Sequence, residues 1–312
     1  MWPVEGETFD LKMHFVGNAF VPKLVCGAGN EDAVEVENLV HLYANNGFRY
    51  FDLSAKPEII EAAMRGLELS GEPGYLNISV GIPGDPHANK AGIDATACIG
   101  CKECVKVCPN GAIFDPPFVK TSKCVGCGRC APVCPTDAIM YYSVAKPILE
   151  VIPPLVEKYP ISSIELHMVG DIEEGKKQWK DLNKCFKGML SLCIDRSLLG
   201  DKDLLELIKW CIKDRKPHTT IIQADGCPMS GDENEGTTLQ AIAFAQIVDR
   251  AHLPVYLMVS GGTNQYTIKG LRQYGVRYDG IAYGTYGRQL VRNAIRNKEF
   301  GPNADIERMV EE

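Results

Sequence analysis

The chain has 312 residues, of which 45% are hydrophobic, and it carries a formal net charge of −7 at pH 7. This composition suits a globular core in one large domain or two ordinary ones, and the acidic balance without a Lys/Arg-rich block argues against nucleic acid as a partner. The opening MWPVEGETFD lacks the basic start and apolar run of a secretion signal, and no segment approaches 18 uninterrupted apolar residues, so we expect no transmembrane segment.

Short apolar runs alternate with helix-periodic runs over the first part of the chain. Strands are predicted at residues 23–29, 50–55 and 75–82, with helices following the first two at 30–47 and 56–69. No helix follows the third strand before residues 144–159. We therefore expect residues 88–143 to be an insertion that separates the third strand from its helix.

The insertion contains two near-copies of one phrase, CIGCKECVKVCPNGAIF and CVGCGRCAPVCPTDAIM, at a constant offset of 26 residues. Each copy has the spacing C-x2-C-x2-C-x3-C-P, which is the bacterial-ferredoxin pattern for [4Fe–4S] clusters. Three thiolates of one copy cap three corners of a cubane, and the fourth ligates the other cubane. Cluster one is predicted to take Cys98, Cys101, Cys104 and Cys134, and cluster two to take Cys124, Cys127, Cys130 and Cys108.

Zinc is the alternative occupant of such a cysteine set. Cys101, Cys104, Cys124 and Cys127 alone would fit a C-x2-C…C-x2-C zinc ribbon. That interpretation leaves four further cysteines of the repeat without a role, so two iron–sulfur clusters are favoured.

After the insertion the alternation resumes and completes eight strand–helix units. The later strands are predicted at residues 162–170, 189–197, 219–226, 254–262 and 279–284. Eight such units predict an α/β fold of the (β/α)8 barrel type, built from residues 1–87 and 144–312, with a ferredoxin-like insert after strand three. A doubly wound parallel sheet is the alternative, because strand order cannot be deduced from one sequence.

Polar residues gather at the ends of the predicted strands. Paired positions i and i+2 on one strand face are Asp52 and Ser54, Glu165 and His167, Cys193 and Asp195, and Gln223 and Asp225. Because buried, unpaired carboxylates are costly, these faces are expected to point to the barrel mouth, where they bind a ligand or hydrogen-bond one another. The candidate catalytic residues are Glu165, His167, Asp195 and Asp225.

Glycine-rich turns end the last two predicted strands, in SGGTN and YGTYGR. Exposed backbone N–H groups and an arginine at this end of a barrel suit a phosphate. The candidate cofactor-binding residues are Ser260, Gly261, Gly262, Gly284 and Arg288, with tight turns that bind nothing as the alternative.

The stretches around these motifs carry a family resemblance. They are KLVCGAGNEDAVEVENLVHLYANNGFRYFDLSAKPEIIEAAMRGL, QADGCPMSGDENEGTT, LMVSGGTN and GIAYGTYGR. With the cysteine repeat, they make nearly the whole chain resemble the light-dependent period protein A family of cyanobacteria and plant plastids. The resemblance implies an iron–sulfur protein that reports cellular redox state to the circadian clock, with the eight cluster cysteines as the residues that carry over. It implies no established reaction.

Two function hypotheses follow. The first is a redox protein whose two [4Fe–4S] clusters relay or sense low-potential electrons and signal to a redox or signalling partner protein. The second is a ferredoxin-coupled oxidoreductase with a flavin or other phosphate-bearing ligand at the barrel mouth. A purely structural role for the clusters is a third hypothesis. The reduced cysteines indicate the cytoplasm, or the plastid stroma if an import sequence has been removed.

Overall fold

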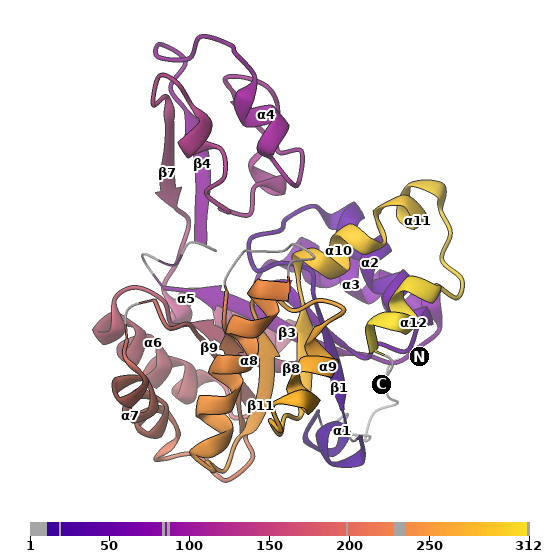
Figure 1. Cartoon of the computed structure of the whole chain (residues 1–312), viewed down its shortest axis with the longest axis vertical. Helices are drawn as coiled ribbons and strands as arrows, with labels where there is room; N and C mark the ends of the chain where they lie inside the picture. The colour runs from indigo at the N-terminus through magenta and orange to yellow at the C-terminus, as the bar shows by residue number, and fades with distance from the viewer. Residues whose placement is uncertain are drawn as a thin grey trace.

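The computed structural model describes residues 11–18, 20–82, 85, 88–197, 199–227 and 235–310. Eight parallel strands close into a barrel, and a smaller cysteine-rich unit stands above one end of it (Figure 1). The barrel strands are β1 (Val21–Val25), β2 (Tyr50–Ser54), β3 (Tyr75–Gly81), β8 (Ile161–His167), β9 (Met189–Ile194), β10 (Thr220–Asp225), β11 (Tyr256–Ser260) and β12 (Gly280–Tyr283).

Closure of the sheet decides between the two predicted topologies. β1 pairs with β2 on one side and with β12 on the other, and the strands follow chain order around the ring. A doubly wound sheet would leave two open edges. The (β/α)8 barrel prediction is therefore confirmed.

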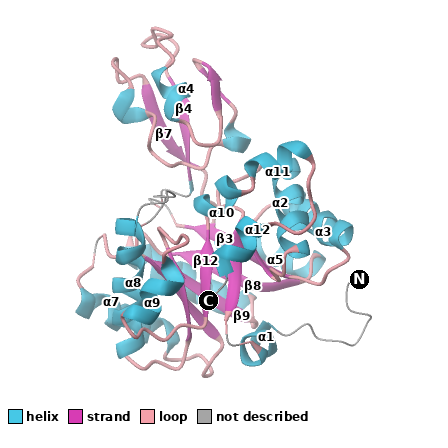
Figure 2. Ribbon diagram, turned by 45° about the vertical axis from the view of Figure 1, so that its right-hand side comes forward, coloured by secondary structure: helices cyan, strands magenta, loops and turns pink. Residues whose placement is uncertain are grey.

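Helices surround the barrel and follow its strands in the order that the sequence predicts (Figure 2). Their ends follow local chemistry: the Asp32 carboxylate accepts the Glu35 N–H before the second helix, and Gly71, at φ 70°, ends the third. The helices are α2 (Ala33–Asn45), α3 (Pro57–Ser70), α5 (Ile148–Lys158), α6 (Ile172–Cys185), α7 (Asp201–Ile212), α8 (Glu235–Arg250), α9 (Thr267–Gln273), α10 (Thr285–Leu290), α11 (Arg292–Asn297) and α12 (Ala304–Val310).

The strands bury apolar side chains against the helices and direct alternate side chains into the barrel. On β2, Phe51 and Leu53 join the core between strands and helices, whereas Asp52 belongs to the interior. Helix α1 (Leu11–Gly17) closes the amino-terminal end of the barrel, where Phe15 stacks on Tyr256 with ring centroids 4.5 Å apart. Because apolar side chains close this end, the polar side chains of the barrel interior can reach a ligand only from the opposite, carboxyl-terminal end.

The inserted unit lies between β3 and β8 in the chain and pairs with neither. Its strands form two small antiparallel sheets, and its own apolar cluster packs around Cys104, Cys124 and Cys130. Its elements are β4 (Asn89–Ile93), α4 (Glu103–Val107), β5 (Ile113–Asp115), β6 (Phe118–Val119), η2 (Thr121–Lys123), η3 (Ala131–Val133) and β7 (Ile139–Ser143). None of the helices in the described ranges is long and apolar enough to span a bilayer.

Candidate functional site

Four cysteines of the inserted unit surround one small cavity. Cys108, Cys124, Cys127 and Cys130 line it, together with Ala112 and Tyr141. This set comes from both copies of the repeat and matches the ligands predicted for cluster two. The donor set fits a cubane, which takes four thiolates. The assignment of ligands to clusters stays a prediction.

Backbone geometry around the cysteines repeats with the sequence. Gly100 and Gly126 have φ values of 69° and 68°, so both ligand loops turn through the left-handed region. The Ala112 N–H donates to Cys108 Sγ at 3.2 Å, and the Ala138 N–H donates to Cys134 Sγ at 3.3 Å. Such N–H donors stabilise negative charge on cluster sulfurs and tune cluster potentials.

Lysine and arginine contacts hold the inserted unit on the barrel. The buried Lys90 ammonium group donates to the carbonyl oxygens of Gly29 and Cys124, at 2.7 Å each. Lys123 pairs with Asp32 at 3.1 Å, and Arg292 donates to the Pro109 carbonyl at 2.8 Å. The loop that carries Cys124 is thus fixed to the loop that follows β1.

A larger cavity, termed here the mouth cavity, lies between the barrel and the inserted unit. All five residues predicted to bind a phosphate-bearing ligand line it, and so do His167 and Asp225. The inserted unit contributes Pro109, Asn110, Val125, Cys127 and Arg129. Glycine loops, two arginines and a cysteine of the repeat therefore border one space.

Arg288 brings a positive charge to the mouth cavity. Its guanidinium group donates to the Val25 carbonyl at 3.0 Å and to the Thr285 hydroxyl at 3.1 Å. Neither acceptor is charged, and in the described part of the chain Arg288 forms no ion pair. Burial lowers its pKa, although not enough to discharge a guanidinium group. The cavity is suited to an anion.

Gly261 must be glycine where β11 enters the mouth cavity. Its φ is +70°, and a Cβ atom there would collide with the Asp225 carboxylate and lie 2.7 Å from the Gly226 nitrogen. We expect Gly261→Ala to destabilise the protein by about 1–3 kcal/mol more than Gly275→Ala. Gly275 also has a positive φ of +63° but open space around it, so it controls for backbone strain alone. Equal shifts in melting temperature would contradict this account of the site.

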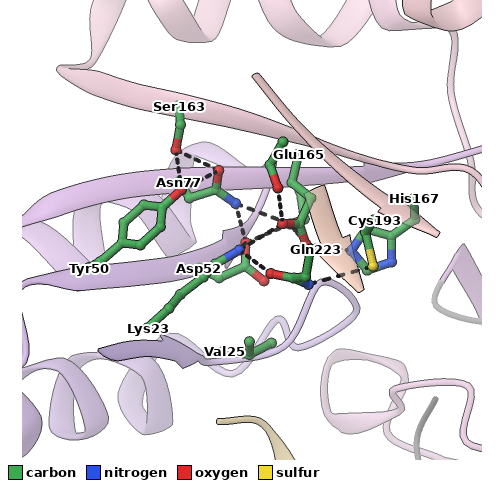
Figure 3. Close-up of polar contacts among 12 residues, drawn as sticks. Lys23, Val25, Tyr50, Asp52, Asn77, Ser163, Glu165, His167, Cys193 and Gln223 are labelled. Atoms are coloured by element: carbon green, nitrogen blue, oxygen red, sulfur yellow. Dashed lines mark hydrogen bonds and ion pairs between the residues drawn. The ribbon is translucent and has the colours of Figure 1, made fainter. Parts of the chain in front are cut away.

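Beneath the mouth cavity, a buried network of charges fills the barrel (Figure 3). The Lys23 ammonium group donates to Glu165 Oε2 at 2.7 Å and to Gln223 Oε1 at 2.9 Å, and it lies 3.9 Å from Asp52 Oδ1. Ser191 donates to Glu165 Oε2 at 2.7 Å, and Gln223 Nε2 donates to Glu165 Oε1 at 2.9 Å. Five strands thus meet through polar side chains.

The network shifts the pKa of its members in opposite directions. Burial alone would raise the pKa of Glu165, but Lys23 and His167 beside it hold that pKa well below its usual range. Burial raises the pKa of Asp52, and the charge of Lys23 only partly offsets this. Lys23 and Glu165 are therefore a charged pair inside the barrel.

His167 is expected to give the protein a dependence of stability on alkaline pH. Burial alone would lower its pKa, but the Glu165 hydrogen bond and the charges of Asp85 and Glu165 raise it to about 9. Because the pKa is raised above 6.5, the imidazolium ion stabilises the fold fully below pH 6.5, and this stabilisation is lost as pH rises through about 9. Between about pH 6 and about pH 10, the free energy of unfolding obtained from melting curves should fall by a few kcal/mol in the wild type. It should fall by less in His167→Gln. Parallel curves would contradict the assignment.

The four predicted catalytic residues occupy different places. His167 and Asp225 line the mouth cavity, whereas Glu165 is fully buried behind His167, whose Nε2 lies 3.1 Å from Glu165 Oε1. Asp195 follows the end of β9, and its Oδ1 accepts hydrogen bonds from the Ser197 N–H and hydroxyl. The structure therefore groups three of the four, and Asp195 stabilises its own turn.

The sequence interpretation did not single out Lys23, Asn77 or Asp85. Lys23 is a charged residue inside the apolar strand VPKLV, and it is only 1% exposed. A lysine at such a position needs buried acids as partners. Asn77, which donates to Asp52 Oδ1 at 2.5 Å, could have been found by the same strand alternation that identified Asp52.

A (β/α)8 barrel with a duplicated cluster-cysteine motif over its mouth defines an iron–sulfur-binding barrel protein. Residues 155–311 match the family model described as "Light dependent period A C-terminal domain", and residues 99–145 match the "LdpA Fe-S cluster-binding domain". A curated relative, "Light dependent period A" of Synechococcus elongatus, is 31% identical over 279 residues, which cover 85% of this chain and 77% of the relative. The chain belongs to the light dependent period A family.

Solved structures that align with this chain over most of its length have low sequence identity to it. (S)-3-O-geranylgeranylglyceryl phosphate synthase from Thermoplasma acidophilum aligns with a TM-score of 0.49 and 10% identity, over 97% of this chain and 99% of its own. Dihydrodipicolinate synthase from Bacillus clausii aligns with a TM-score of 0.41 and 9% identity, over 95% and 79%.

Proposed function

We propose that this protein relays or senses low-potential electrons through two [4Fe–4S] clusters and communicates their state to a redox or signalling partner protein. The observation that carries the proposal is the duplicated cysteine repeat, with Cys108 of the first copy facing the same cavity as Cys124, Cys127 and Cys130 of the second. Paired clusters held this way exchange electrons at short range. The name of the curated relative supports light-dependent timing as the process served.

The two clusters differ in their surroundings, which supports an order of electron transfer. Cys127, a predicted ligand of cluster two, borders the mouth cavity, and the Cys124 loop is fixed to the barrel by Lys90. Cys101, a predicted ligand of cluster one, is exposed. A protein donor would therefore reach cluster one first, and cluster two would exchange electrons with the barrel side.

Stopped-flow reduction of single-cluster variants tests this order. Reduced bacterial-type ferredoxin is the protein donor, and dithionite is the small reductant that reaches either cluster. We expect Cys101→Ser, which lacks cluster one, to lose most of its reduction rate with ferredoxin while keeping its rate with dithionite. Cys127→Ser should keep both rates for cluster one. Clusters that neither donor reduces would contradict the proposal and favour a structural role.

The mouth cavity supports a second candidate function, a ferredoxin-coupled oxidoreductase. Its ligand would be a flavin or another phosphate-bearing molecule held by Ser260, Gly261, Gly262, Gly284 and Arg288, since backbone N–H groups and a guanidinium group suit a phosphate. His167 and Asp225 would face the reacting part of the ligand. Glu165 would orient His167.

Ligand release and thermal shifts test the second candidate. Acid-released supernatant is examined for flavin, and the holoprotein is screened with flavins and phosphorylated metabolites. We expect at least one compound to stabilise the protein. Its apparent affinity should fall at least tenfold in Arg288→Gln. It should be unchanged in Arg296→Gln, the control, because Arg296 is exposed on α11. No released flavin and no shift with any compound would remove this candidate and leave the electron relay.

A further inference from the structure

Three side chains of metal-ligating type converge at the carboxyl ends of β8 and β9, at the floor of the mouth cavity, and Asp225 at the end of β10 lies beside one of them. Candidate ligand atoms of Glu165, His167 and Cys193 all lie within 4.8 Å of one another, and all three residues are buried. Cys193 Sγ also lies 3.8 Å from Asp225 Oδ2. Figure 3 shows His167 and Cys193 side by side, next to Glu165. We propose that these four residues bind one divalent transition-metal ion, of which Zn²⁺ is the best match.

Two of the observed separations lie within about 0.2 Å of those expected for tetrahedral zinc. Bonds of about 2.0–2.3 Å to N, O and S place neighbouring ligand atoms about 3.3–3.8 Å apart. Glu165 Oε1 and His167 Nε2 are 3.1 Å apart, and Cys193 Sγ and Asp225 Oδ2 are 3.8 Å apart. One thiolate, one imidazole and two carboxylates form a donor set that favours zinc over magnesium or calcium, which prefer oxygen alone.

Residues outside the four already orient them as ligands. Lys23 and Ser191 both bind Glu165 Oε2, so that Oε1 is the oxygen directed to His167. Asp85 Oδ2 lies 3.7 Å from His167 Nδ1, on the side of the ring away from Glu165. This separation is that of an ion pair, so Asp85 places a negative charge behind the ring, where metal-ligating histidines commonly have a carboxylate. Gln223 Nε2, 3.5 Å from Cys193 Sγ, supplies a donor to the sulfur.

The balance of charge also favours a cation. The carboxyl groups of Asp52, Asp85, Glu165 and Asp225 are at most 5% exposed, and the cationic groups that contact this set are the Lys23 ammonium group and the His167 ring. Lys23 occupies the far oxygen of Glu165 and also binds Gln223, so it remains outside the ligand set. On binding, the ion replaces the proton between His167 Nε2 and Glu165 Oε1 and the thiol proton of Cys193, and both protons leave to solvent.

The position of the site gives it access from one side. His167 and Asp225 line the mouth cavity, and Cys127 lines the same cavity from the inserted unit. With four protein ligands the tetrahedral shell is complete, so an ion held here forms a closed site in the floor of the mouth cavity, as structural zinc sites do. This inference is independent of the proposed electron relay, because none of the four residues belongs to the cysteine repeat.

Zinc binding to the anaerobically purified holoprotein tests the proposal. The protein is equilibrated with Zn²⁺ in a chelator buffer, and zinc and iron are counted in the same sample by mass spectrometry, while the cluster absorbance shows that the cluster cysteines remain occupied. We expect one zinc per wild-type chain. Affinity should fall at least tenfold in Cys193→Ser and about tenfold or more in Asp85→Asn, which removes the carboxylate behind His167.

Cys211→Ser is the matched control, because Cys211 is a buried thiol on α7 away from the site. It should bind zinc as the wild type does. Cobalt(II) provides a second readout: a thiolate-to-cobalt absorption band in the difference spectrum against zinc-loaded protein should be present in Cys211→Ser and absent in Cys193→Ser. No stoichiometric zinc in the wild type, or equal binding by Cys193→Ser, would overturn the proposal. Iron content and cluster reduction in the same samples report separately on the relay.

Discussion

Replacing Cys108 by Ser is expected to remove one cluster and lower the iron content from about eight to about four atoms per chain. The reason is the predicted crosswise ligation of the repeat, in which Cys108 of the first copy would complete the cluster of the second. In the structure Cys108 lines one cavity with Cys124, Cys127 and Cys130. Iron and acid-labile sulfide counted on anaerobically purified protein measure the loss.

Two double variants separate crosswise from sequential ligation. Cys108→Ser with Cys127→Ser removes two ligands of the same cluster and should retain about four irons. Cys108→Ser with Cys101→Ser removes one ligand from each cluster and should retain almost none. If each copy held its own cluster, the two results would be exchanged.

Replacing Lys23 by Met is expected to destabilise the protein by about 3–5 kcal/mol, which is the usual cost of leaving a buried charge without its partner. The substitution keeps the length of the side chain but leaves Glu165 without its ammonium partner at 2.7 Å and Asp52 without its neighbour at 3.9 Å. Both carboxylates are fully buried, so water cannot replace the lost charge. Chemical denaturation of the holoprotein, followed by circular dichroism, gives the change.

Lys158→Met is the matched control for Lys23→Met. Lys158 also pairs with a glutamate, Glu61, at 3.2 Å, but its side chain is 64% exposed. We expect a change in unfolding free energy far smaller than that of Lys23→Met, because solvent screens such exposed pairs. If the two substitutions had equal effects, the buried network would not be a stabilising feature of the barrel.

The barrel could be predicted because each strand–helix unit is a local pattern. Eight apolar strands and eight helix-periodic segments appear in order, and an interruption after residue 82 marks the insertion. The predicted ends of the strands were less accurate. Residues 26–29 were predicted to continue the first strand, but β1 ends at Val25, and Gly27 has a φ of 113°. Glycine with a positive φ terminates the extended chain there.

The candidate site was only partly predictable, because its contacts join distant parts of the chain. Strand alternation indicated that Glu165 and His167 share a face, and both lie in the barrel interior. The Lys23 contacts reach across 142 residues to Glu165 and across 200 residues to Gln223, which no local pattern reveals. For Asp195 the local pattern was misleading. Alternation places it on the same strand face as Cys193, but it lies in a turn after β9, where its side chain accepts a hydrogen bond from the Ser197 N–H.

The participation of the inserted unit in the mouth cavity also required the structure. Repeat spacing predicts which cysteines bind iron, but it does not show which half of the inserted unit faces the barrel. Lys90, Lys123 and Arg292 determine that orientation, and in the sequence these residues look like ordinary surface charges. Arg129 and Cys127 thereby reach the same cavity as Arg288.

A reductive titration followed by electron paramagnetic resonance, on anaerobically purified protein with counted iron and sulfide, shows whether the chain holds two redox-active clusters. The account predicts about eight irons and about eight sulfides per chain, with two clusters that each take up one electron and return it on reoxidation. Protein without iron, or clusters that reduction leaves unchanged, would contradict it.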